Sequence, residues 1–256
     1  MAQVIRGAEP WSADGGEVGV LVLHGLTGNP VSMRPLAEEL ARRGFAVELP
    51  RLPGHGTRWQ ELQKTTWCDW AREARAGLEH LRARTGAVVV AGLSMGATLA
   101  LHLAQARGGR PDGLVLVNPT VTTKDPAYTD DRWVRLLPAL QWVLPAVRGV
   151  GNDIAKPGAD EKPYPRMPLK AFASFLRLQA QVRRRLCSVD LPTLVLTSRH
   201  DHVVPPEDSL RVLDGISSTD AEHVWLEDSY HVATLDHDLP RIAEATAGFA
   251  RRLAPA

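Results

Sequence analysis

The stretch that decides the fold of this 256-residue chain is Val88-Val89-Val90-Ala91-Gly92-Leu93-Ser94-Met95-Gly96. It begins with an apolar, β-branched run, which is typical of a strand buried on both faces of a sheet. Helical spacing starts directly after Ser94 and continues to about residue 106. Gly92 and Gly96 complete a Gly-x-Ser-x-Gly pattern at the junction of strand and helix. This context makes Ser94 the candidate nucleophile.

The two glycines have a steric reason in this setting. A sharp turn from a strand into a helix strains the backbone of its central residue, and side chains at 92 or 96 would collide with neighbouring elements. The turn then holds the Ser94 hydroxyl at the carboxyl edge of the sheet, over a helix N-terminus that favours negative charge. A glycine-rich turn that binds a phosphate is the alternative, but no lysine or second glycine pair follows Gly96.

Further strands and helices alternate along the chain. Apolar runs predict strands at 18–23, 45–49, 113–117, 193–197 and 223–226, and helical spacing predicts helices at 30–43, 67–84, 169–186, 206–213 and 238–253. Strands that alternate with helices form a parallel sheet with helices on both faces. We therefore predict an α/β fold with a mostly parallel central sheet.

One long segment interrupts this alternation, because no convincing buried strand lies between 113–117 and 193–197. We expect residues 1–120 and 190–256 to form the α/β core and residues 121–189 to form a helical cap inserted into it. An apolar stripe in the cap either lines a substrate pocket or packs the cap onto the core. It comprises Trp133, Leu136, Leu137, Leu140, Val143, Leu144 and Val147. The arginines at 183–185 are interpreted as a solvated helix face, with contact to anionic lipid as the alternative.

A serine hydroxyl needs a base, and His231 is suitably located for this role. It follows the last predicted strand and precedes the last helix. With this type of turn, the acidic residue lies between the serine and the histidine in sequence, and Asp201, just past the strand at 193–197, fits that order. A carboxylate there can orient the imidazole and stabilise its protonated form. Asp208 and Asp228 are alternatives in less suitable places.

Acyl transfer also needs two backbone N–H groups that face the developing oxyanion. Met95 supplies one of them because it directly follows Ser94. Leu26, in the loop after the strand at 18–23, is expected to supply the other. Taken alone, His24-Gly25-Leu26 would fit a tight strand exit equally well.

The composition argues against several classes of protein. A formal net charge of +1 does not favour binding to nucleic acid, which requires a basic surface. The cysteines, Cys68 and Cys187, are too few for a disulfide framework. Residues 1–10 lack the apolar core of a signal peptide and no run is long enough for a membrane helix, so we expect a soluble cytoplasmic protein.

The cluster His200-Asp201-His202 also fits a metal site, but no further ligands at suitable spacing support it, and we expect no metal.

Six segments in this order resemble the α/β-hydrolase superfamily and, within it, the bacterial carboxylesterase and monoacylglycerol lipase family. They are HGLTGNP (24–30), SMRPLAE (32–38), LPRLPGHGT (49–57), GLSMG (92–96), DHVVPP (201–206) and SYHVATLD (229–236). The resemblance runs in register from about residue 7 to residue 253. It implies a serine esterase that acts on monoacylglycerols and on short- to medium-chain esters, with Ser94, Asp201 and His231 as the catalytic triad.

The same resemblance implies the remaining site residues. The oxyanion donors are the amides of Leu26 and Met95, and members often have Phe in place of Leu26, which affects the shape of the pocket more than the chemistry. The match is looser in the cap, where it implies that Val150 and Glu161 belong to the pocket for the alcohol. No metal or organic cofactor is needed for the implied mechanism, which proceeds through an acyl-enzyme.

Two other classes of function remain open at this stage. The same fold supports acyl transfer to another acceptor, perhydrolysis and C–C bond cleavage, because a fold does not fix the chemistry. A non-catalytic ligand-binding module is the other class, although such modules usually lose a triad member and all three candidates are present here.

Overall fold

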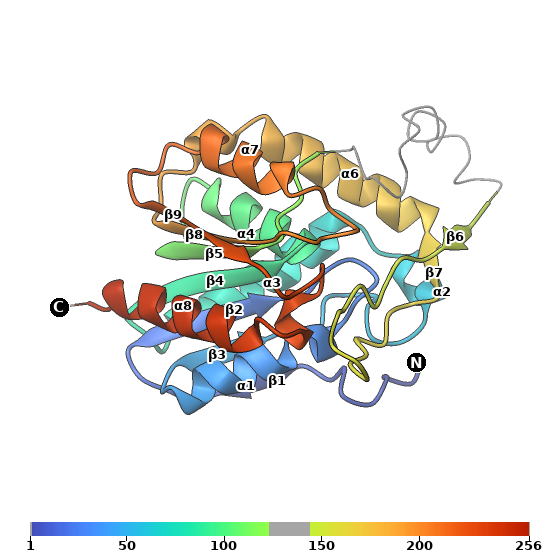
Figure 1. The fold of residues 1–256 in the computed structure, drawn as a ribbon, viewed down its shortest axis with the longest axis horizontal. Coiled ribbons are helices and arrows are strands. Elements are labelled where there is room, and N and C mark those ends of the chain that lie inside the picture. Colours follow the sequence, from blue (N-terminus) through green and yellow to red (C-terminus); the bar gives the residue numbers. More distant parts are fainter. Residues whose placement is uncertain (1, 123–143, 256) are drawn as a thin grey trace.

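The fold is seen in a computed structural model that describes residues 2–122 and 144–255 (Figure 1). Within these residues the central sheet has seven strands in the order β1-β3-β2-β4-β5-β8-β9. Neighbouring strands are parallel except β1 and β3, which are antiparallel. The predicted α/β fold with a mostly parallel sheet is therefore confirmed.

The elements agree closely with those predicted from apolar runs and helical spacing. The strands of the central sheet are β1 (Trp11–Ala13), β2 (Val18–Leu23), β3 (Ala46–Leu49), β4 (Ala87–Leu93), β5 (Gly113–Val117), β8 (Thr193–Ser198) and β9 (Ala221–Leu226). The α-helices are α1 (Arg34–Arg42), α2 (Trp59–Leu62), α3 (Trp67–Arg82), α4 (Met95–Ala104), α6 (Leu169–Arg183), α7 (Glu207–Gly215) and α8 (Leu239–Arg252). Short 3-10 helices are η1 (Pro30–Ser32), η3 (Leu186–Ser188) and η4 (Ala233–Leu235). The bounds of β2 and β5 are the predicted ones because these strands are continuous apolar runs.

Helices cover both faces of the sheet (Figure 1): α1 and α8 pack on one face, and α3, α4 and α7 pack on the other, with α6 outside α3 and α4. Alternate residues of each strand point to opposite faces, so Val20 packs with α1 and α8, whereas Leu21 packs with α3 and α4. Both faces of β2, β4 and β5 are fully buried, which explains why these strands are apolar at every position. Because they are parallel, the segments after β2, β4, β5, β8 and β9 meet at one edge of the sheet.

Three short strands were not predicted. The edge strand β1 has no apolar run, since Ser12 is exposed and its neighbours are only half-buried. A separate antiparallel sheet of β6 (Ala146–Arg148) and β7 (Arg166–Pro168) lies between β5 and β8 in sequence. Strands of three residues are too short for a periodic pattern to indicate them.

The predicted apolar stripe is seen only in part. Trp133, Leu136, Leu137, Leu140 and Val143 lie outside the described residues. Leu144 is exposed, and Val147 packs against the core that contains α4 and α6. In the part of the chain that the structure describes, no helix is both long and apolar enough to cross a bilayer.

Two buried histidines lie in the loops that follow β2 and β3. The imidazole rings of His24 and His55 are fully buried, and their centroids are 4.9 Å apart. His24 Nε2 accepts a hydrogen bond from the Leu52 amide at 3.2 Å, so protonation at this atom would break the bond. Burial lowers the pKa of His24 to about 4, and burial together with the neighbouring His24 lowers the pKa of His55 well below its usual value.

We expect this pair to make the fold sensitive to acid. Unfolded histidines bind a proton below about pH 6.5, whereas these two stay neutral in the fold, so the free energy of unfolding should fall between pH 7 and pH 4. The shift of His24 alone corresponds to about 3 kcal/mol. Urea unfolding at several pH values measures the effect. His55→Gln should flatten the pH dependence and the exposed control His200→Gln should not; equal slopes in all three proteins would contradict the assignment.

Candidate active site

The backbone of Ser94 is strained by the turn between β4 and α4. Its φ of 55° and ψ of −117° lie in a region that L side chains rarely adopt, at a typical cost of about 1–3 kcal/mol. A Cβ atom at Gly92 would lie 2.3 Å from the carbonyl carbon of Gly96, and one at Gly96 would lie 2.1 Å from the Leu23 carbonyl oxygen. The predicted steric requirement for both glycines is therefore met, and the turn directs Ser94 into a pocket.

Asp201 and His231 meet at the same edge of the sheet. Asp201 lies in the loop after β8, where its Oδ1 accepts hydrogen bonds from the amides of Val203 and Val204, both at 2.8 Å. Its Oδ2 lies 2.7 Å from His231 Nδ1. The side chains of Asp201 and His231 are only 1% and 10% exposed. The carboxylate is thus fixed by the backbone and orients the imidazole through its second oxygen.

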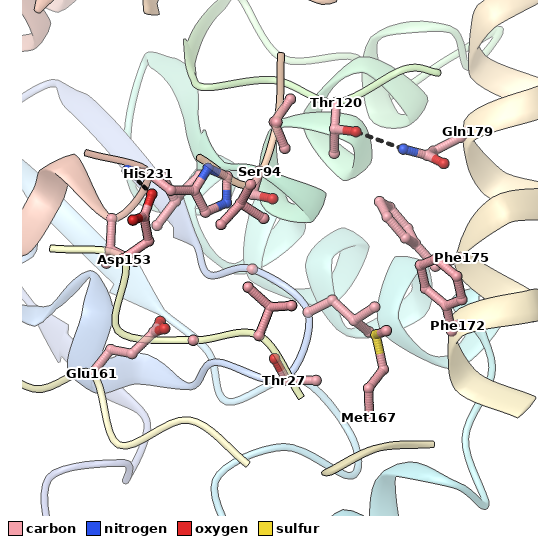
Figure 2. A pocket seen from close by; sticks show the side chains of 18 of the residues that line it. Thr27, Ser94, Thr120, Asp153, Glu161, Met167, Phe172, Phe175, Gln179 and His231 are labelled. Atoms are coloured by element: carbon pink, nitrogen blue, oxygen red, sulfur yellow. Dashed lines mark hydrogen bonds between the residues drawn. The ribbon is translucent and has the colours of Figure 1, made fainter. Parts of the chain in front are cut away.

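The His231 imidazole lies beside Ser94 in the pocket (Figure 2). With Nδ1 directed at Asp201, the other ring nitrogen is left to accept a proton. No hydrogen bond joins the Ser94 hydroxyl to His231 among the residues described, and contacts of this kind commonly tighten only when a substrate binds. The structure therefore brings together the three side chains that sequence order had associated.

Two backbone amides flank Ser94 without partners. Met95 is the first residue of α4, so its N–H has no acceptor within the helix. Leu26 lies in the loop after β2, and a Cβ at the adjacent Gly25 would be 3.5 Å from Ser94 Cβ, which shows how closely this loop passes the serine. Within the described ranges, neither N–H donates a hydrogen bond. Both can therefore bind an anionic oxygen near Ser94.

The pocket has a polar and an apolar side. Figure 2 shows Asp153 and Glu161 on the side of His231, and Phe172 and Phe175 from α6 opposite them. Both candidate residues for the alcohol pocket, Val150 and Glu161, line it. Glu161 is buried, and its Oε1 accepts a hydrogen bond from the amide of Asn152 at 2.9 Å. A ligand with one polar and one apolar end would fit this division.

Charge near His231 favours its protonated form. Burial, the largest single effect, lowers the pKa of His231, but Asp201, Glu161 and Asp153 together raise it above the usual value. Burial also raises the pKa of Glu161, which the imidazole opposes. The protonated imidazole is therefore stabilised by its contact with Asp201 and by the charges of Glu161 and Asp153.

Asp153 contacts the site in a way that sequence analysis missed. Its Oδ2 accepts a hydrogen bond from the His231 amide at 3.0 Å. The backbone carbonyl of His231 is held by Asn118, whose Nδ2 donates to it at 2.8 Å. Asn118 directly follows β5, so its place at the carboxyl end of a buried strand was the available signal.

The alternative acids and the metal cluster have other roles. Asp208 accepts hydrogen bonds from Val121, Thr122 and Arg211, and the exposed Asp228 makes no described contact with His231. The Asp201 carboxylate contacts the His231 ring, and His202 Nδ1 lies 2.9 Å from Asp153 Oδ1. No group of three potential ligands converges anywhere in the two described ranges.

Comparisons with known proteins find relatives that match nearly the whole chain. A family model described as serine aminopeptidase, S33 (Hydrolase_4), matches residues 17–238. The chain is 41% identical over 248 residues to a thermostable monoacylglycerol lipase of Bacillus sp. (strain H-257), covering 96% of this chain and 95% of that protein. It is 26% identical over 246 residues to a carboxylesterase of Bacillus subtilis (strain 168), covering 96% and 97%. A solved structure from a study of two metagenome-derived lipolytic enzymes superposes with a TM-score of 0.91 at 38% identity, covering 98% of this chain and 100% of that one.

We expect removal of the Glu161 charge to lower the pKa of His231. Glu161→Gln keeps the shape of the side chain but removes one of the carboxyl groups that favour the imidazolium. An NMR titration of the histidine ring signals, assigned with a His231→Gln sample, measures the change. The matched control is Glu207→Gln on the exposed start of α7, which should leave the titration as in the parent protein. An unchanged pKa in Glu161→Gln would show that this carboxyl does not act on the base.

Proposed function

The chain belongs to the serine aminopeptidase S33 (Hydrolase_4) family of α/β-hydrolases, and we propose that it is a serine esterase that hydrolyses monoacylglycerols and short- to medium-chain esters. It is a carboxylic ester hydrolase, as its likeness to a monoacylglycerol lipase and a carboxylesterase over nearly the whole chain indicates. Beyond this class of enzyme, we propose its catalytic residues, its mechanism and its preferred substrates.

One observation carries the proposed chemistry. Asp201 Oδ2 lies 2.7 Å from His231 Nδ1, and that imidazole lies beside a serine on a strained turn (Figure 2). A serine, a histidine and a carboxylate in this order of contact form a nucleophile, its general base and the group that orients the base. Ser94, His231 and Asp201 are accordingly the proposed triad.

The proposed reaction has two steps. Ser94 Oγ attacks the ester carbonyl carbon while its proton passes to His231 Nε2, and the amides of Leu26 and Met95 bind the resulting oxyanion. The bond to the alcohol then breaks, and Nε2 returns the proton to the departing oxygen. A water molecule then gives a proton to the same nitrogen and attacks the acyl carbonyl carbon. The bond to Ser94 Oγ breaks, Nε2 returns the proton to Oγ, and the acid leaves the restored enzyme. Asp201 stabilises the imidazolium in each step.

The two sides of the pocket support an amphipathic substrate. Phe172, Phe175 and Met167 offer apolar contacts to an acyl chain. On the other side, Glu161 and Val150 are proposed to contact the alcohol, where a buried carboxyl group can accept hydrogen bonds from glycerol hydroxyls. An alkyl ester lacks these hydroxyls and would use only the apolar side.

Residues 121–189 are proposed to form a cap inserted into the core at 1–120 and 190–256. The strands β5 and β8 are neighbours in the sheet, so the segment between them is added to a continuous core. This segment contributes α6, Val150, Gly151 and Asp153 to the wall of the pocket. The cap would therefore determine which esters enter, while the core carries the triad.

We expect a fluorophosphonate probe to label the protein at Ser94. The probe reacts only with a serine whose hydroxyl is activated by a base, so Ser94→Ala should abolish labelling while the exposed control Ser12→Ala labels at the parental rate. Peptide mapping by mass spectrometry identifies the modified residue. Folded protein that is not labelled, or is labelled elsewhere, would rule out Ser94 as the nucleophile.

Replacing Glu161 tests the proposed site for glycerol. Loss of a hydrogen bond to a charged group costs about 1.5–3 kcal/mol, so Glu161→Ala should lower kcat/KM for 1-monooctanoylglycerol by roughly 10- to 100-fold. Ethyl octanoate forms the same acyl-enzyme and also needs a proton from His231 on its leaving alcohol, but it lacks the glycerol hydroxyls, so its kcat/KM should fall much less. Because both leaving groups are aliphatic alcohols, the ratio of the two values largely removes any effect of the substitution on His231. The exposed neighbour Asp160 provides the control variant Asp160→Ala, and an equal loss for both esters would exclude the assignment.

A further inference from the structure

The backbone of His231 is held through both its N–H and its carbonyl group. Asn118 Nδ2 donates to its carbonyl oxygen at 2.8 Å, and its N–H donates to Asp153 Oδ2 at 3.0 Å. His231 lies in a loop between β9 and α8, where no sheet or helix ladder would hold the backbone. These two hydrogen bonds therefore hold the backbone of His231 in place of the regular hydrogen bonds of a strand or a helix.

Asn118 connects the loop of the base to the central sheet. It follows β5 with a φ of 45°, and its backbone N–H donates to the Leu196 carbonyl of β8 at 2.9 Å. Its Oδ1 accepts a hydrogen bond from the amide of Ser198 at 2.7 Å, and Ser198 Oγ donates to the Tyr230 carbonyl at 2.8 Å. Asn118 is only 2% exposed. The buried side chain of Asn118 thus connects the ends of β5 and β8 to the loop that carries His231.

Asp153 connects the same loop to the loop of Asp201. Besides the His231 amide, its Oδ2 accepts a hydrogen bond from the His202 amide at 3.1 Å, and its Oδ1 lies 2.9 Å from His202 Nδ1. The backbone of Asp153 is held as well, because its carbonyl accepts a hydrogen bond from Val232 at 3.0 Å. One carboxylate therefore sets the distance between the loop that bears the acid and the loop that bears the base.

We propose that Asn118 and Asp153 are positioning residues that hold the main chain of His231 so that its imidazole bridges Asp201 and Ser94. This inference rests on the proposed function, in which His231 moves the proton. Groups that fix a catalytic side chain matter because small displacements at the reacting atoms lower rates strongly. Asp153 has a second effect, since its charge, with those of Asp201 and Glu161, stabilises the imidazolium and raises the pKa of His231.

Variants of Asp153 separate the two effects. Asp153→Asn keeps an oxygen that can accept from both amides but removes the charge, so kcat should change little while the acid limb of kcat/KM moves to lower pH. Asp153→Ala removes the contact, and kcat for p-nitrophenyl butyrate should fall by roughly 10²-fold with KM little changed. Asn118→Ala should lower kcat in the same way without moving the limb.

The control is Asp208→Asn, because Asp208 is another buried carboxylate that accepts main-chain hydrogen bonds but does not contact His231. It should lower the melting temperature and leave the acid limb unchanged. If Asn118→Ala fails to fold, the two Asp153 variants still test the proposal, since Asp153 is only partly buried at the wall of the pocket. Parental kcat and an unmoved limb in folded Asp153→Ala would overturn the inference. Absence of fluorophosphonate labelling in the parent protein would instead overturn the proposed function.

Discussion

The close approach of α4 to β2 at the turn of Ser94 is the constraint on which the site depends. The helix comes so near that Gly96 has no space for a side chain against the Leu23 carbonyl, and Gly92 has none against Gly96. This contact strains Ser94 and directs its side chain into the pocket, and the Met95 amide has no partner because α4 begins there. The proposed nucleophile and one proposed oxyanion donor are therefore fixed by the same turn, and the fold bears the strain because the strands beneath the turn are fully buried.

The parallel arrangement of the strands brings the remaining site residues together. The loop after β2 contributes Leu26, the loop after β8 contributes Asp201, and the loop after β9 contributes His231. Residues that are far apart in sequence meet because all these strands end at the same edge. What the sheet does not provide is the orientation of a side chain within each loop. Buried hydrogen bonds to the backbone provide it, as the two amides that hold Asp201 show.

This division explains how much the sequence alone could predict. The strands at 18–23 and 113–117 were predicted to the residue because burial on both faces makes every position apolar. Ser94 was found from a local pattern of strand, turn and helix, and the triad candidates followed from chain order. The contacts of Asn118 and Asp153 with His231 span 113 and 78 positions, and their partners are backbone atoms, which every residue has. The place of Asn118 at the end of a buried strand could have indicated a site residue, but no pattern of side chains indicates which backbone atoms Asn118 and Asp153 contact.

Residues 150–161 have consequences for the chemistry as well as for the shape of the pocket. They bring Glu161 next to the loop that carries the Leu26 amide, where a Cβ at Gly28 would lie 3.2 Å from Glu161 Oε2, and they bring Asp153 to the His231 amide. Two of the three carboxyl groups that raise the pKa of His231 therefore come from residues 150–161 and not from the segments that directly follow β4, β8 and β9. Since the pKa of a base governs the pH range in which it accepts a proton, a change confined to this segment can alter the working pH without touching the triad.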